Sequence, residues 1–421
     1  MSASVHESVP VQPPPTRRLC TDCGVSRTQE PKRCAHACQF IQPDYPKLER
    51  QIHGVDGGRA HPERPDTLFF GPHRAMWQAR MQTPQAGAQW TGITTSLAQA
   101  LLDSGVVDAV LTVEPDADDR WKPQPVLVTR SEDLVRCRGM RMGYAPLLSL
   151  VEPALAAGHK RLAVIAIPCQ VYPLRALEAS WRSEHGLKSL YVIGTPCSDN
   201  TTTANFHEFL KLLSDRPQDI EYLEFRADYR VELRHTGGHV RTIPFLNLPL
   251  SRLPQDFFPL TCRTCVDYTN RLSDITVGYM GGRGDQWLIV RNAQGQEMLD
   301  LLGTKISLQA PTEAGQRKGP VKGFLANTLR AAGGLPLRRT PAWLKPLVNW
   351  LMPRMGPRGL EFARARVEMK AIESVVHLRR ELPARVPHMV PDHVWQLAQP
   401  YGLTRDDGRP SPTSAQETAC V

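Results

Sequence analysis

The stretch APLLSLVEPALAAGHKRLAVIAI, residues 145–167, decides the fold class of this chain. Residues 145–157 predict a helix that ends at Gly158, and residues 161–167, which are mostly apolar, predict a buried strand. The same order recurs upstream, where residues 94–104 predict a helix closed by Gly105 and residues 107–113 predict a strand rich in β-branched side chains. Repeated helix-to-strand units predict an α/β core with parallel strand pairing.

Cysteines follow two of these predicted strands directly. The strand at 161–167 continues into PCQ, residues 168–170, and a second apolar strand at 190–193 continues into GTPC, residues 194–197. Ligands in parallel α/β folds bind beyond the carboxyl ends of the strands. We therefore expect Cys169 and Cys197 at the edge of the sheet where ligands bind.

The rest of the chain predicts other elements around this core. Residues 221–226, 229–235 and 239–243 alternate apolar and polar side chains around Gly237-Gly238, which predicts a β-hairpin. Strands are predicted at 274–279 and 286–291, and a long amphipathic helix at 359–382. Residues 41–90 show no clear periodicity and predict irregular structure. The expected fold is α/β, with a mixed sheet core covered by helices.

Composition limits the class of protein. The 421 residues are 41% hydrophobic and 22% charged, and no apolar run approaches the roughly 20 residues of a membrane span. Residues 1–16 lack the pattern of a signal or transit peptide, so we expect a disordered tail on a cytoplasmic protein. Residues 301–421 hold 18 Lys and Arg against 9 Asp and Glu, which accounts for the whole net charge of +9. Such a basic region suits a nucleic acid, a membrane surface or an acidic protein, or is simply a solvated face.

The ten cysteines are grouped rather than scattered. Close pairs in a reducing cytosol indicate metal binding more often than disulfides. Cys20, Cys23, Cys34 and Cys38 lie within nineteen residues of sequence and can close around one metal centre. Their spacing alone leaves an iron–sulfur cluster and a structural zinc equally open.

A second group is spread along the chain as Cys169, Cys197, Cys262 and Cys265. Ligands gathered from distant segments suit a cluster buried beside a cofactor, although Cys169 or Cys197 taken singly could be an ordinary buried cysteine. Cys137 is flanked by two arginines, which would lower its pKa if it were exposed, and we leave it outside the ligand set. Cys420 lies in the polar C-terminal tail.

Nucleotide-binding signals are weak. No Gly-x-Gly-x-x-Gly run follows a strand, so direct use of a pyridine nucleotide is not supported. The glycine cluster between residues 278 and 284 would let the backbone approach a flat ligand closely, although a bare turn is the commoner explanation. Electrons must therefore reach this protein by another route.

Four runs resemble a known family: PCQV at 168–171, GTPCSDN at 194–200, CRTCVDYTN at 262–270 and DITVGYMG at 274–281. They are similar to the beta-subunit family of deazaflavin-reducing hydrogenases. Within it they look closest to a branch that holds the ferredoxin-dependent 8-vinyl reductase of divinyl chlorophyllide and the 7-hydroxymethyl chlorophyll reductase. The resemblance covers about residues 20–302 and, more weakly, the run GLEFAR at 359–364.

The resemblance implies FAD and two 4Fe-4S clusters. One cluster would be held by Cys20, Cys23, Cys34 and Cys38, and the other by Cys169, Cys197, Cys262 and Cys265. Flavin contacts are expected from Thr91, Gly92, Thr94, Thr95, Gln170, Asn270, Met280 and Gly281.

The resemblance also implies a domain plan. We expect a tail at 1–16, an irregular N-terminal iron–sulfur segment at 17–90, an α/β domain for FAD and the second cluster at 91–302, and a basic helical region at 303–421.

The function implied is reduction of the 8-vinyl group of divinyl chlorophyllide or protochlorophyllide to ethyl, in chlorophyll or bacteriochlorophyll biosynthesis. Reduced ferredoxin would be the electron donor, and its acidic surface would match the basic C-terminal region. An anionic membrane surface near the pigment is the competing partner for that region. We further expect a homo-oligomer that binds no nucleic acid. The residue that donates the proton is unknown.

Two alternatives stay open at this level. The first is reduction of 7-hydroxymethyl chlorophyll a, or of an unrelated substrate by another iron–sulfur flavoprotein, for example with a deazaflavin donor. The second belongs to a different class, a zinc-stabilised nucleic-acid-binding protein that uses the basic C-terminal region.

Overall fold

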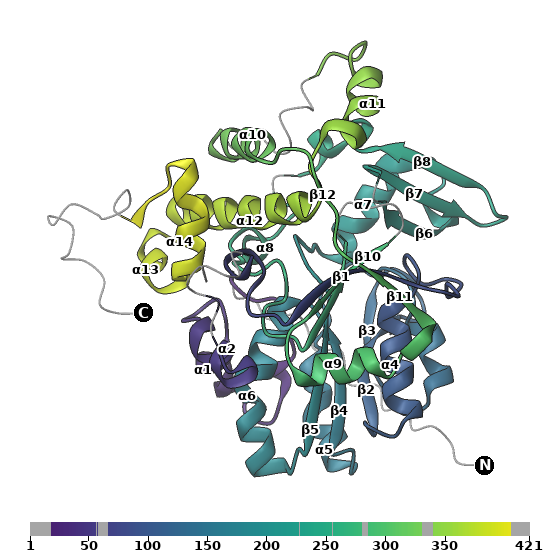
Figure 1. The fold of residues 1–421 in the computed structure, drawn as a ribbon, viewed down its shortest axis with the longest axis vertical. Coiled ribbons are helices and arrows are strands. Elements are labelled where there is room, and N and C mark those ends of the chain that lie inside the picture. Colours follow the sequence, from purple (N-terminus) through teal and green to yellow (C-terminus); the bar gives the residue numbers. More distant parts are fainter. Residues whose placement is uncertain are drawn as a thin grey trace, which may run out of the picture.

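The computed structural model describes residues 18–55, 57, 66–226, 228–254, 256–279, 285–330 and 340–405. Its centre is an eight-stranded sheet with the order β11-β1-β10-β9-β5-β4-β2-β3 (Figure 1). The strands are β1 Ala75–Met81, β2 Ala109–Pro115, β3 Pro123–Val128, β4 Arg161–Ala166, β5 Ser189–Gly194, β9 Ile275–Gly278, β10 Gln286–Val290 and β11 Ile306–Gln309.

The middle of this sheet is parallel and its margins are antiparallel. Strands β2, β4, β5 and β9 pair in parallel, whereas β3, β10, β1 and β11 join as antiparallel neighbours. The predicted α/β class with a mixed sheet is confirmed. The carboxyl ends of four parallel strands thus lie at one edge of the sheet, where a ligand is expected.

Helices cover both faces of the sheet. On one face, α4 Ile93–Asp103 and α9 Ala293–Asp300 pack Leu97 and Met298 against alternate residues of the strands, such as Val110 and Ile193. On the other face, α5 Val151–Ala156 and α6 Pro168–His185 pack Leu155 and Trp181 against residues of opposite alternation. Because successive side chains of a strand point to opposite faces of the sheet, each continuous apolar run contributes side chains to the core on both faces.

Some predicted elements need correction. Residues 145–157 form a short 3-10 turn, Leu147–Leu150, followed by α5, because Pro146 and Pro153 interrupt a single helix. Residues 41–90, predicted to be irregular, contain α2 Tyr45–His53, α3 Thr67–Phe70 and the interior strand β1. Strand β1 pairs with β10 and β11, which come some 200 residues later in the sequence. Its strand conformation therefore depends on distant partners and cannot be recognised from its local sequence pattern.

A separate three-stranded antiparallel sheet confirms the predicted hairpin. It consists of β6 Ile220–Phe225, β7 Arg230–His235 and β8 Val240–Pro244, and α7 Thr203–Leu213 packs on it. Gly237 and Gly238 both have φ near +85°, which is the left-handed backbone that a two-residue hairpin turn requires. Figure 1 shows this sheet beside the main one, at the upper right.

The described C-terminal region is mainly helical, as predicted. The long helix α12 Leu360–Glu381 lies across one end of the main sheet, with the other C-terminal helices around it (Figure 1). These are α10 Lys318–Leu329, α11 Lys345–Met355, α13 Val386–Met389 and α14 Asp392–Ala398, and a two-residue ladder pairs β12 Glu313–Ala314 with β13 Arg358–Gly359. No helix among the described residues is both long and apolar enough to span a bilayer.

Candidate functional site: two neighbouring cysteine groups

The first cysteine group surrounds a short helix near the N-terminus. Cys34 begins α1 Cys34–Ala37 and Cys38 caps its end, while Cys23 precedes a tight turn at Gly24. Gly24 has φ +109°, and a Cβ there would lie 2.5 Å from the Ser149 nitrogen, so only glycine lets this loop pack on the main domain. The backbone N–H of Leu148 donates to the Cys23 carbonyl at 2.9 Å and fixes the same contact.

The four thiols of this group lie close enough to influence one another. Burial raises the pKa of the Cys23 thiol, and nearby Cys34, Cys38 and Cys20 raise it further. The Asp22 N–H donates to Cys20 Sγ at 3.4 Å, and the Asp22 carboxylate is held by Arg27 at 2.6 Å. The predicted N-terminal group is therefore gathered in the fold.

The second group meets at the carboxyl edge of the parallel strands. Cys169 lies in the first turn of α6 directly after β4, and Cys197 follows β5. Cys262 lies in α8 Leu260–Arg263, and Cys265 comes just beyond its end. Burial and the proximity of the other three thiols raise the pKa of Cys169.

Burial also raises the pKa of Cys262 to about 12 and that of Cys265 to about 11. Thiolates crowded in a buried space are costly unless a cationic centre compensates them, and thiolate is the form that binds a metal. The Asn200 N–H donates to Cys262 Sγ at 3.3 Å, and hydrogen bonds to sulfur of this kind tune iron–sulfur clusters. The donor set of each group thus fits an iron–sulfur cluster.

No three His, Cys, Asp or Glu side chains within the described ranges are arranged to hold a single metal ion. A four-iron cluster separates its ligand sulfurs more widely than one tetrahedral ion does. All nine cysteines in the described part of the chain are free of disulfides. Cys420 lies outside the described residues.

The two cysteine groups are neighbours in space. Gln39, which follows Cys38 of the first group, directs its side-chain N–H₂ toward Cys265 Sγ of the second at 3.8 Å. Thr21, which follows Cys20, hydrogen-bonds through its side chain to Cys169. Gln39 and Thr21, each adjacent to a cysteine of the first group, thus contact cysteines of the second group. This proximity was not predicted from the sequence, because 226 residues separate Gln39 from Cys265.

A buried lysine from the C-terminal helix α12 adjoins the second group. Lys370 Nζ donates to the Cys262 carbonyl and pairs with Asp199 at 2.9 Å and Glu373 at 3.0 Å, and its side chain is 3% exposed. Its positive charge acts to lower the pKa of the Cys262 thiol, against the effect of burial. Sequence reasoning missed Lys370, although a lysine on a helix face shared with buried Ala363, Val367 and Ser374 was a usable signal.

The described residues among those predicted to contact flavin gather at the same edge of the sheet. Thr91 Oγ1 donates to Gln286, the first residue of β10, at 3.0 Å. Gly92 caps α4 with φ +85°, the Ile93 N–H in the first turn donates to Gln286 Oε1 at 3.3 Å, and Thr94 and Thr95 lie half-buried beside it. A helix start binds an anionic ligand through backbone N–H groups that have no other partner, and here Gln286 already accepts the N–H of Ile93.

Gln170 and Asn270 have structural partners of their own. The Gln170 side chain accepts a hydrogen bond from the Ile167 N–H and donates one to the Ala145 carbonyl. Both the oxygen and the nitrogen of its amide are therefore engaged. Asn270 is fully buried with φ +60° and donates to the Ala166 carbonyl at the end of β4, while its Oδ1 finds no partner among the described residues. Met280 and Gly281 lie outside the described residues. Contact of any of these residues with flavin stays a prediction.

Cys137 lies in a partly buried position, where the effect of its arginine neighbours on the thiol pKa does not dominate. Burial raises the pKa of its thiol to about 12, and Glu114 adds to the effect. Arg136 is paired with that same Glu114 at 2.6 Å, and Arg138 donates to the Ala86 carbonyl. A reactive thiol was expected only if Cys137 were exposed, and this condition is not met.

A run of aromatic side chains, also missed from the sequence, connects α12 with the small sheet and the edge of the main sheet. Tyr279 lies 5.0 Å from Trp90 and 4.8 Å from Phe362, measured between ring centroids. Tyr229 lies 6.0 Å from the same Phe362, and its hydroxyl donates to the Pro357 carbonyl. The rings of Trp90 and Tyr279 are tilted by 44°, and Phe362 meets Tyr279 and Tyr229 edge to face, so these side chains pack on one another.

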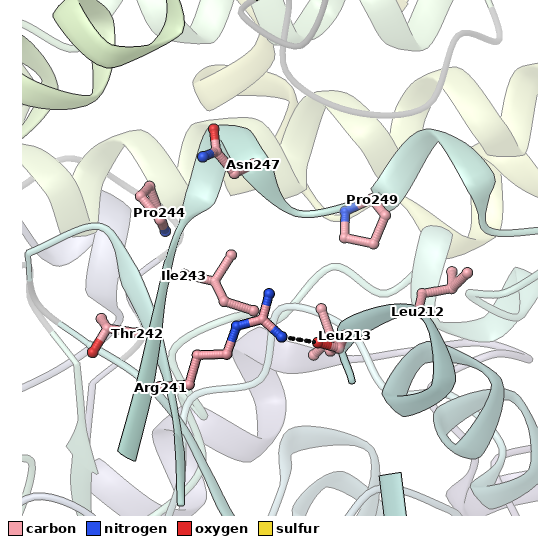
Figure 2. A pocket seen from close by; sticks show the side chains of 8 residues that line it. All are labelled: Leu212, Leu213, Arg241, Thr242, Ile243, Pro244, Asn247 and Pro249. Carbon is pink, nitrogen blue, oxygen red and sulfur yellow. Dashed lines mark hydrogen bonds between the residues drawn. The ribbon is translucent and has the colours of Figure 1, made fainter. Parts of the chain in front are cut away.

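Figure 2 shows a different hollow, away from the cysteine groups, between β8 and the end of α7. Arg241 crosses it and donates to the Leu213 carbonyl at 2.7 Å. It is lined by Leu212, Leu213, Arg241, Thr242, Ile243, Pro244, Asn247 and Pro249. None of the predicted site residues lines this hollow.

Comparisons with known proteins agree with the architecture. Residues 76–152 match the N-terminal model, and residues 159–314 the C-terminal model, of the coenzyme F420 hydrogenase/dehydrogenase beta subunit. An uncharacterised protein of Nostoc is 35% identical, covering 92% of this chain and 95% of its own length. The chloroplastic 7-hydroxymethyl chlorophyll a reductase of rice, Oryza sativa subsp. japonica, is 32% identical, covering 94% of this chain and 84% of its own length.

A solved structure shares the fold. A chain of the F420-reducing [NiFe] hydrogenase complex from Methanosarcina barkeri superposes with a TM-score of 0.51 at 21% identity, covering 57% of this chain and 83% of its own. The family models together span more than half of the sequence, and two relatives align over almost all of it. This chain therefore belongs to the coenzyme F420 hydrogenase/dehydrogenase beta-subunit family and is an oxidoreductase.

Proposed function

We propose that this chain is an iron–sulfur flavoprotein reductase that takes electrons from reduced ferredoxin and converts the 8-vinyl group of divinyl chlorophyllide or protochlorophyllide to ethyl. Cys20, Cys23, Cys34 and Cys38 hold one 4Fe-4S cluster. Cys169, Cys197, Cys262 and Cys265 hold the other. When bound, the clusters and FAD would supply one-electron carriage and a two-electron hydride donor.

The observation that carries this proposal is the contact between the two cysteine groups. Saturating a vinyl group takes two electrons and two protons, whereas ferredoxin delivers one electron at a time. Two centres linked through Gln39 and Thr21 suit a protein that must gather single electrons. A structural zinc would need no such neighbour, so the adjacency disfavours the zinc-stabilised nucleic-acid-binding alternative.

The chain's own residues also have roles in the proposal. The start of α4 and the buried Asn270 lie at the carboxyl edge of the strands, where they would orient the flavin. Trp90, Tyr279 and Phe362 place packed aromatic rings beside that edge, where they would contact a planar pigment. Lys370, itself paired with Asp199 and Glu373, would lie beside the second cluster as a buried cation.

A second substrate is favoured by a specific finding. The 7-hydroxymethyl chlorophyll a reductase of rice aligns with nearly the whole of this chain, including the C-terminal helices. Reduction of the 7-hydroxymethyl group is therefore the alternative reaction on the same cofactors. The two substrates differ in which pigment substituent must face the electron donor.

The first test is an anaerobic assay of the reconstituted protein with reduced ferredoxin and each pigment in turn. Formation of the 8-ethyl product, followed by absorption and chromatography, supports the proposal. Turnover of only the 7-hydroxymethyl pigment would move the assignment to the second substrate. A colourless protein without iron or flavin would refute the redox mechanism itself.

Cys262→Ser tests the ligand assignment directly. The variant is expected to lose about half of its iron and sulfide and all ferredoxin-driven turnover, because it lacks one ligand of a buried cluster. Cys137→Ser is the matched control, since it removes a buried thiol that lies outside both groups. A Cys262→Ser protein with full iron content and full activity would overturn the assignment.

A further inference from the structure

The net positive charge of the protein comes from one short part of the chain. Residues 314–360 contain nine Lys and Arg and no Asp or Glu, whereas the rest of the sequence holds 42 of each sign. Lys318, Lys322, Arg330, Lys345 and Arg354 form no ion pair with any described residue. The resulting local field attracts an anionic partner.

The same part of the chain exposes large apolar side chains. Ten large hydrophobic residues are exposed in the described ranges, and half of them fall between residues 329 and 355. They are Leu329 (56% exposed), Trp343 (79%), Leu347 (51%), Trp350 (55%) and Met355 (69%). Single exposed apolar residues are ordinary on a protein surface, but such a concentration marks an interaction site.

Helical spacing places three of these side chains, Trp343, Leu347 and Trp350, in one stripe. Trp343 lies in the turn just before α11, and Leu347, Trp350 and Arg354 follow at the fourth, seventh and eleventh positions after it. The Arg354 guanidinium lies 4.3 Å from the centre of the Trp350 ring. Apolar and cationic groups therefore share one exposed face of α11.

The opposite side of α11 is anchored to the protein. Asn349 donates to Asn247 Oδ1 at 3.3 Å, and α11 packs on the 3-10 turn Phe245–Asn247. In Figure 1 this helix lies at one end of the molecule, away from α1, α6 and α8, which carry cysteines of the two groups. The exposed stripe is thus held in place and faces outward.

We propose that this stripe, together with the basic side chains of Lys345 and Arg354 on α11 and of Lys318, Lys322 and Arg330 on and just after α10, docks the protein on the surface of an anionic lipid bilayer. Tryptophan, leucine and basic residues on one helix face match the chemistry of the membrane interface, where rings sit among headgroups and cations meet lipid phosphates. Such docking needs only a narrow stripe on a protruding helix.

Other occupants fit the observations less well. A second copy of this chain, meeting the first through the same face, would bring two unbalanced positive regions together and so be opposed by like-charge repulsion. An acidic electron donor would gain from the charge, but at α11 it would lie away from the cysteine groups that must receive its electrons. The apolar side chains would also contribute little to a purely electrostatic encounter.

Vesicle flotation of the full-length reconstituted protein tests the proposal. The protein is expected to float with phosphatidylcholine vesicles that contain phosphatidylglycerol, to stay unbound with phosphatidylcholine alone, and to be released by high salt. The double variant Trp343→Ser with Trp350→Ser is expected to weaken binding at least about tenfold, since both rings lose their burial in lipid. Lys345→Glu with Arg354→Glu should weaken it as well.

The matched control is the pair Val135→Ser and Leu308→Ser, which removes exposed apolar side chains elsewhere on the surface. It should float like the wild type, and all variants should keep their iron content and pigment turnover in detergent-free solution.

Equal flotation of the tryptophan variant and the wild type would overturn the proposal, as would no binding of the wild type to anionic vesicles. A fall in oligomeric mass of the tryptophan variant in analytical ultracentrifugation would assign the face to contact between copies. Loss of ferredoxin binding without any vesicle binding would assign it to an acidic protein. Either result would also overturn the lipid assignment.

Discussion

Arg175 and Asp274 form the most completely buried ion pair that can be tested beneath the cysteine edge. Their side chains are 2% and 0% exposed, and Arg175 Nη2 lies 2.7 Å from Asp274 Oδ1. Arg175 also donates to the Leu272 carbonyl at 3.0 Å. Asp274 directly precedes β9, so this pair fixes the position at which the segment that carries Cys262 and Cys265 enters β9.

Arg175→Met is expected to lower the free energy of unfolding by about 3–5 kcal/mol, the usual cost of removing one partner of a buried pair. Methionine keeps much of the apolar stem, so the loss comes from the unpaired charge rather than from a cavity. Asp274 would retain only the N–H of Val192 and the amide of Asn292, both at 2.7 Å. Two neutral donors do not replace a guanidinium in the interior.

Arg182→Met, on the same helix, is the matched control. Arg182 is 42% exposed and pairs with Glu178 at the surface, where such pairs contribute about 0–1 kcal/mol. Urea unfolding of the protein under anaerobic conditions is followed by circular dichroism. The urea concentrations at the unfolding midpoints of the two variants are compared, with the same dependence of the unfolding free energy on urea concentration assumed for both. If both variants lie within about 1 kcal/mol of each other, the role given to the buried pair is wrong.

Two further predictions use the same unfolding assay. Gly238→Ala is expected to lower the free energy of unfolding by about 1–2 kcal/mol, because φ is +84° and the new Cβ would meet open space, so only backbone strain is added. Gly319→Ala, in helix α10, should instead leave that free energy unchanged or raise it by up to about 1 kcal/mol. Equal effects at both sites would contradict this account. Burial lowers the pKa of His53 from 6.5 to about 3, so between these pH values the unfolded chain binds a proton that the folded chain does not. The free energy of unfolding should therefore fall as the pH drops from about 6.5 toward 3, by at most ~1.4 kcal/mol per pH unit for this group. His53→Gln should make this pH dependence less steep, and an unchanged dependence would show that His53 is not responsible.

Local patterns predicted the middle of the sheet well. The strands at 161–167 and 190–193 were found within a residue or two because their apolar runs are bounded by glycine and proline. The Gly237-Gly238 turn was found because a two-residue hairpin needs positive φ at both positions. These features depend on neighbours in sequence, so the sequence alone reveals them.

Features that depend on distant partners were not predictable in this way. The segment AMWQARM, β1, has no clean alternation, and its place in the sheet depends on pairing with β10. The long helix α6 was missed because its prolines, Pro168 and Pro173, weaken the helical pattern, although proline in the first turn is favourable. The cysteine ligand sets were proposed from spacing and resemblance, whereas the contact of Gln39 with Cys265 required the fold.

The C-terminal helix α12 is part of the candidate site even though the family models end at residue 314. It places Lys370 against Cys262, and Phe362 against Tyr279, so one helix approaches both the second cysteine group and the aromatic surface. Lys370 is buried, but it is paired with both Asp199 and Glu373, so its charge is compensated within the fold. The basic C-terminal region therefore has two separable parts: α12 completes the site from within, while α11 presents its charge and its tryptophans outward.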